Sequence, residues 1–105
     1  MKTANKLTSY TPTHPGEVIK DEIEYRDISQ KQLSEQIGVP YTMLNEILNG
    51  KRPVTPTIAI LLEAALGIDA EIFVNMQTRY NMQLARKDKD LMIKFKQVRK
   101  IASIL

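Results

Sequence analysis

The stretch that decides the fold of this chain is Gln30–Asn49, QKQLSEQIGVPYTMLNEILN, which is followed at once by Gly50–Pro53, GKRP. Its first half predicts a helix, because Ser29 is a good N-cap and Gln32 stands where the second member of a capping box belongs. Gly38 supplies the positive φ with which a chain leaves a helix and turns sharply. The stretch therefore opens with a short helix and a tight turn.

A second helix is expected directly after this turn. Pro40 suits its first position, since proline has a helix-compatible φ and lacks an N–H that would be unpaired there. Leu44, Ile47 and Leu48 share one face of this helix, which Asn49 ends. Two short helices that pack through such apolar positions form a helix-turn-helix motif, here at about residues 29–49. In this motif the second helix is presented to the major groove of DNA.

The polar residues that the motif leaves exposed are the candidate DNA-binding residues. Thr42 and Asn45 are candidates for base contacts, because a hydroxyl donates or accepts and an Asn amide can pair with adenine through two hydrogen bonds. Glu46 either accepts from a cytosine amine or pairs within the protein, and Tyr41 is placed to contact sugar or phosphate. The complete set is Gln30, Lys31, Tyr41, Thr42, Asn45, Glu46, Asn49, Lys51 and Arg52.

Net charge is informative only when it is divided by segment. The whole chain carries +3, but residues 14–80 hold six basic and ten acidic residues, whereas residues 81–105 hold seven basic and two acidic ones. Phosphate contacts of the motif then rest on Gln30 and on the cations Lys31, Lys51 and Arg52. Few phosphate contacts give weak binding with a shallow salt dependence, so two copies per DNA site, as a homodimer, are expected.

Composition excludes several classes of protein. The chain of 105 residues has room for one core and one appendage, and it contains no Cys and a single His. It therefore has little to offer a metal site or a nucleophile–base pair, and we expect no enzyme, no metal and no cofactor. No stretch is apolar enough for a membrane span, and MKTANKLTSY lacks the apolar region of a signal peptide. A cytoplasmic location without membrane contact is expected.

The rest of residues 14–80 predicts a helical platform for the motif. One helix is expected from Pro15 to about Tyr25, with an acidic start, and another from the Thr55-Pro56 cap to Gly67. Asp69 caps a further helix, whose apolar residues are expected to complete the core: Ile72, Phe73, Met76 and Tyr80. Five helices with short connections indicate a compact all-α domain.

The two ends of the chain differ from this domain. Residues 1–13 are polar and without a cap, which predicts a flexible arm. Residues 81–105 predict a basic amphipathic helix with a heptad-type stripe of Leu91, Phe95, Val98, Ala102 and Leu105. A stripe this short needs a partner surface. That surface is the chain's own domain or a dimer mate, a partner protein that orders the segment, or DNA.

Short motifs on both sides of the helix-turn-helix indicate a protein family. In order, they are His14-Pro15-Gly16-Glu17, Asn49-Gly50-Lys51-Arg52, Thr55-Pro56, Ala64-Ala65-Leu66-Gly67 and Phe73-Val74-Asn75-Met76-Gln77. This succession resembles the HigA antitoxins of HigBA toxin-antitoxin modules, over roughly residues 14–80, and the motif itself resembles that of the repressor and Cro class, or XRE family. Two departures are Pro40, where the family often has a small polar residue, and Val74, where Trp or Leu is common.

The resemblance implies a fold and a function. The fold would be all-α, a five-helix repressor/Cro-like helix-turn-helix domain with an additional C-terminal helix. The function would be that of a type II antitoxin, a DNA-binding dimer that represses its own operon at its promoter and neutralises a RelE-like ribonuclease toxin. Two alternatives stay open: an XRE-type transcriptional repressor without a toxin partner, and a helical interaction module that has lost DNA binding.

Overall fold

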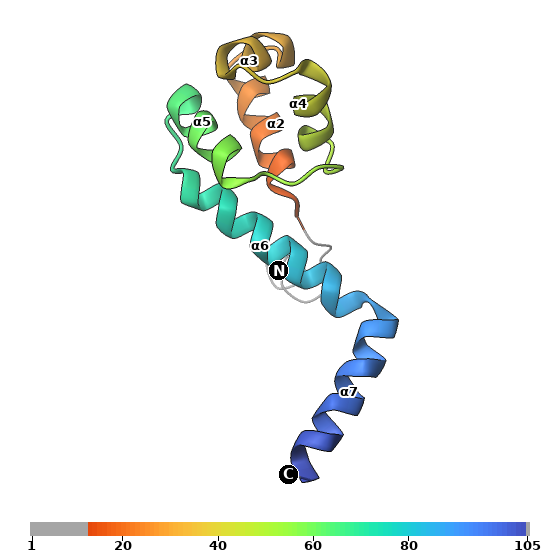
Figure 1. Cartoon of the computed structure of the whole chain (residues 1–105). Helices are drawn as coiled ribbons and strands as arrows, with labels where there is room; N and C mark the ends of the chain where they lie inside the picture. Colours follow the sequence, from red (N-terminus) through yellow and green to blue (C-terminus); the bar gives the residue numbers. More distant parts are fainter. Residues whose placement is uncertain (1–12, 105) are drawn as a thin grey trace, which may run out of the picture. The chain divides into compact units, whose positions relative to one another are not determined.

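The structure is a computed structural model that describes residues 13–104. Within this range the chain forms helices and no strands, as Figure 1 shows. The helices are α2 (Pro15–Tyr25), α3 (Gln30–Ile37), α4 (Tyr41–Leu48), α5 (Pro56–Leu66), α6 (Ala70–Lys87) and α7 (Lys89–Ile104). The predicted all-α class, with five helices and one more at the C-terminus, is confirmed for the described residues. Residues 1–12 of the predicted flexible arm lie outside them.

The described chain divides into two compact units, Thr13–Thr78 and residues 79–104. The first unit contains α2 to α5 and the first half of α6, and within it α3 packs on α4 and α5 while α2 packs on α4. The second unit contains the rest of α6 and all of α7. No residue of α7 is buried. No helix among the described residues is long and apolar enough to span a membrane.

The ends of the helices follow the local sequence. Ser29 Oγ accepts from the Gln32 N–H at 3.0 Å while Gln32 Oε1 accepts from the Ser29 N–H at 2.8 Å, which completes the predicted capping box at the start of α3. Gly38 ends α3 at φ 74°, as its place in the turn predicted. Thr55 caps α5, where its Oγ1 accepts from the Ile58 N–H at 3.3 Å. The prediction of these three helix ends is confirmed.

Pro40 departs from its predicted position by one residue. It is the N-cap of α4 and not its first helical residue, because its ψ of 141° is extended. No side chain caps α4, so the N–H groups of its first turn lack a side-chain acceptor. Helix α4 therefore begins at Tyr41.

The core of the first unit is formed by the apolar faces of its helices. Fully buried members of α2 to α5 include Ile19, Leu33, Leu44, Ile47 and Leu62, which form one core cluster with Phe73 of α6. The expectation that Ile72 joins this core is wrong, since Ile72 is 49% exposed. The buried residues of α6 are Ala70, Phe73 and Gln77, three and four residues apart, and Ile72 lies about 100° or more from each of them around the helix.

Candidate nucleic-acid interface

The centre of the interface is a hydrogen bond between the two helices of the motif. Asn45 of α4 donates its Nδ2 to the Oε1 of Gln30, the first residue of α3, at 2.9 Å. Both side chains are partly exposed. Because Gln30 holds one N–H of the Asn45 amide, the amide plane keeps a fixed orientation, which favours directional contact with a base edge.

Asn49 extends this row of polar groups along α4. Its Nδ2 donates to the Asn45 backbone carbonyl at 2.9 Å and to Asn45 Oδ1 at 3.2 Å, while its Oδ1 accepts from Lys20 Nζ at 3.5 Å. Lys20 lies on α2 and was not among the predicted residues. No local signal marks it, since it meets Asn49 only through the packing of α2 on α4. Lys20 is thus a fourth cation beside the motif, in addition to the three that the sequence predicted.

Glu46 and Arg52 form an ion pair next to this row. Arg52 Nη2 lies 2.8 Å from Glu46 Oε1, and Arg52 Nε donates to the same oxygen at 3.0 Å. Of the two alternatives for Glu46, the free protein thus adopts the pair within the protein. Both side chains are substantially exposed, so the pair contributes little to stability. It does reduce the positive charge that Arg52 offers to phosphate.

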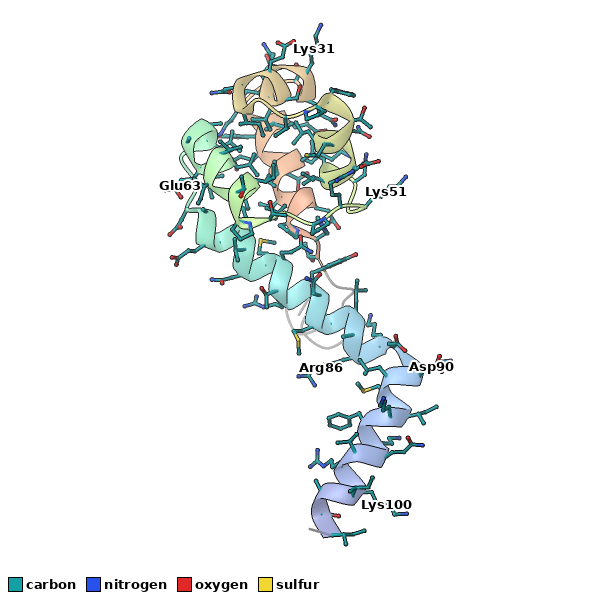
Figure 2. The ribbon with its side chains drawn as sticks, viewed as in Figure 1. Lys31, Lys51, Glu63, Arg86, Asp90 and Lys100 are labelled. Atoms are coloured by element: carbon teal, nitrogen blue, oxygen red, sulfur yellow. The ribbon has the colours of Figure 1, made fainter. Side chains whose placement is uncertain are left out.

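The remaining predicted residues are exposed on α3, on α4 and in the turn after α4. Tyr41 and Thr42 lie on the first turn of α4, and Lys31 lies on the first turn of α3. Figure 2 shows Lys31 and Lys51 extending outward from the first unit, whereas Glu63 lies on the other side of that unit, over α5. Glu63 Oε1 accepts from the Ala70 N–H there, at 3.0 Å. Lys31 and Lys51 therefore lie away from this carboxylate (Figure 2).

The arrangement suits recognition. Residues 13–104 contain no group of three His, Asp or Glu residues that would hold a metal ion. They do present a row of amide groups that runs from the start of α3 along α4, flanked by cations. Such a row supplies donors and acceptors to base edges, while cations contact the phosphates on either side.

Comparison with known proteins agrees with this geometry. The family model HTH_3, helix-turn-helix, matches residues 19–73. Antitoxin HigA-1 of Vibrio cholerae is 37% identical over 73 residues, which cover 69% of each chain. A HigA-family addiction module antidote protein from Coxiella burnetii has a TM-score of 0.71 and 31% identity, with 86% of this chain and 94% of that chain covered. The Pseudomonas aeruginosa antitoxin HigA, solved with the higBA promoter, has a TM-score of 0.73 and 28% identity, covering 80% and 92%.

Proposed function

Since the chain belongs to the helix-turn-helix family HTH_3 and to the HigA antitoxin family, we propose that it binds its own promoter as a homodimer and neutralises a RelE-like ribonuclease toxin. The family consists of DNA-binding regulators and not of enzymes. The single observation that carries the DNA-binding part is the row Gln30–Asn45–Asn49, held by hydrogen bonds on the exposed side of α4. The nine predicted residues are proposed as its DNA contacts.

The proposal that the DNA target is the chain's own promoter is based on a relative. The Pseudomonas aeruginosa antitoxin was solved with the higBA promoter, and the helix-turn-helix lies within the part that this chain shares with it. By extension, α4 of this chain enters the major groove of its own operator, with Thr42 and Asn45 at the base edges. Lys31, Lys51 and Arg52 bind phosphates on either side.

Dimer formation is supported by the charge of the motif. The segment of residues 14–80 is net acidic by four charges, and one of its cations, Arg52, is paired with Glu46. A single copy then neutralises few phosphates and binds weakly. Two copies on a two-fold symmetric site double both the phosphate contacts and the number of bases read.

The toxin-binding part of the proposal concerns the second unit. In α7 the stripe of Leu91, Phe95 and Val98 is about half exposed, and Arg99 lies over the Phe95 ring at 5.9 Å from its centroid. An apolar stripe of this length is marginal without a partner surface. We therefore propose residues 81–105 as the segment for contact with a dimer mate or partner protein, beside residues 14–80 as the DNA-binding domain.

Two measurements test the proposal. An electrophoretic shift of the gene's own upstream DNA compares the native chain with a Thr42→Ala, Asn45→Ala double variant, and we expect only the native chain to prefer that DNA over random DNA. Co-expression with the neighbouring gene tests the toxin, which we expect to co-purify. A specific shift without any co-purifying product would favour the repressor without a toxin.

A further inference from the structure

We infer that His14 and Gly16 are positioning residues for DNA binding, which hold the end of α4 and the turn bearing Lys51 and Arg52 against the start of α2. This inference rests on the proposed function. The two residues lie before the helix-turn-helix and have no access to DNA, since His14 is only 3% exposed. Their proposed effect on DNA binding is therefore indirect.

His14 links two segments that are 38 positions apart in the sequence. Its Nδ1 accepts from the Gly16 N–H at 2.9 Å and caps α2. A ring nitrogen that accepts carries no proton, so the proton of the neutral imidazole sits on Nε2. Nε2–H is then the group that bonds the backbone carbonyl of Arg52. One imidazole thus serves as acceptor toward α2 and as donor toward the turn after α4.

Gly16 sets how closely α2 approaches α4. A Cβ at this position would collide with the backbone carbonyl oxygen of Ile47, the penultimate residue of α4, and would lie 2.9 Å from its carbonyl carbon. The contact is with backbone, which cannot rotate away as a side chain can. Only glycine therefore permits the start of α2 to touch the end of the recognition helix at this distance.

The turn after α4 is held from both sides. On the α4 side, the Gly50 N–H donates to the Ile47 carbonyl at 3.1 Å and the Lys51 N–H donates to the Glu46 carbonyl at 2.8 Å. On the α2 side, His14 lies beside Gly50, since a Cβ added there would be 3.7 Å from the His14 Cβ, and the His14 ring bonds the Arg52 carbonyl. The backbone that carries Lys51 and Arg52 is thereby fixed relative to α4 before DNA arrives.

Fixing this backbone in advance affects binding more than folding. A turn that is already in its bound conformation loses less conformational entropy when its side chains contact phosphate. Loosening the turn should weaken those contacts without removing a cation. The result would resemble loss of a phosphate contact, although the altered residue is buried.

The charge state of His14 agrees with this geometry. Burial lowers the pKa of His14 below its usual value of 6.5, while the Arg52 carbonyl bond and the Glu17 carboxylate act in the opposite direction. The charge that acts on it is that of Glu17 in the first turn of α2, whereas Arg52 acts through its backbone carbonyl. Since no other histidine exists in the chain, its ring signals can be observed without overlap.

The test separates helix capping from positioning. His14→Asn keeps a good N-cap for α2, but its side chain is shorter than an imidazole and does not reach the Arg52 carbonyl. We expect a folded protein whose operator Kd rises about three- to tenfold, the range expected when part of one buried hydrogen bond is lost, with a salt slope smaller by about one. The matched control is Thr55→Ala, which removes the cap of α5 and should leave operator affinity and salt slope unchanged.

A second measurement needs no variant. Nitrogen NMR of the single imidazole in the native protein should show the Nε2–H tautomer at pH 7. An unchanged salt slope and affinity for His14→Asn, or a mixture of both tautomers in the native protein, would overturn the inference. Failure of the native chain to bind its operator would instead refute the proposed function, so the two failures are distinguishable.

Discussion

At the scale of single residues, polar side chains bind one another across the surface that we propose for DNA binding. Gln30, Asn45 and Asn49 share hydrogen bonds, and Glu46 binds Arg52. Sequence alone predicted every member of these contacts as a candidate, because each lies on the exposed side of a recognisable motif. It did not predict the pairing, nor Lys20, because these depend on how helices far apart in the sequence pack.

Removing the charge of Glu46 tests the role of its ion pair. Glu46→Gln should free Arg52 for phosphate and remove one repulsive charge, so affinity for random DNA should rise about threefold, with a salt slope steeper by about one. Fluorescence anisotropy with operator and random duplexes measures both quantities. A loss of operator affinity at one base pair, with random binding unchanged, would show instead that Glu46 reads a cytosine.

Truncation of Asn45 and truncation of Arg52 are expected to change DNA binding in different ways. Asn45→Ala should cost about 1–3 kcal/mol of specific binding and relax the preference at one base position, whereas Arg52→Ala should weaken binding to all sequences and reduce the salt slope. A panel of single-base operator variants distinguishes the two patterns. Equal losses on operator and random DNA for both variants would refute this division between reading and anchoring.

His14 gives stability a defined dependence on pH. Its pKa is lowered in the folded protein, so the folded state favours neutral imidazole. Its contribution to stability is therefore full above the unfolded pKa of about 6.5 and is lost as pH falls through the lower, folded value. The difference in urea midpoint between pH 7.5 and pH 5 should be larger for the native chain than for His14→Asn. Identical differences would show that His14 does not titrate in this way.

At the scale of helices, the sequence predicted the helix ends that are determined by residues close together in the chain. Ser29 with Gln32, Gly38 and Thr55 mark helix ends because their side chains or φ values act within a few residues. Where the outcome depends on packing, the prediction was less accurate. Pro40 caps α4 and does not begin it. Phe73 is buried as predicted, but Ile72, which was predicted beside it in the core, is exposed. The close approach of Gly16 to the Ile47 carbonyl was likewise not predicted, because it depends on the packing of α2 against α4.

Helix α7 should be dispensable for folding of the first unit and necessary for association. Phe95 is 46% exposed and no residue of α7 is buried, so Phe95→Asp should leave the melting temperature unchanged. The new charge in the apolar stripe should disrupt self-association, toxin binding or both. Sedimentation velocity and co-purification with the neighbouring gene product measure these. Native behaviour in both experiments would remove α7 from the proposed contacts.

At the scale of the whole molecule, the division of charge explains why a single copy should bind weakly. The total of +3 arises from basic segments at both ends, with +2 in residues 1–13 and +5 in residues 81–105, whereas residues 14–80 carry −4. Affinity must then come from a few well-positioned cations, from directional contacts of α4 and from a second copy. Composition predicted this balance, because charge counts do not depend on the fold. Which surface joins two copies does depend on it, and sequence could not predict that surface.

The most direct test of the account is the stoichiometry and salt dependence of binding to the gene's upstream DNA. Fluorescence anisotropy should show two protomers per operator, a preference over random duplex, and loss of that preference in the Thr42→Ala, Asn45→Ala variant. The logarithm of the binding constant should fall with salt at a slope that reflects few phosphates per protomer. Absence of any binding to the upstream DNA at low salt would contradict the account.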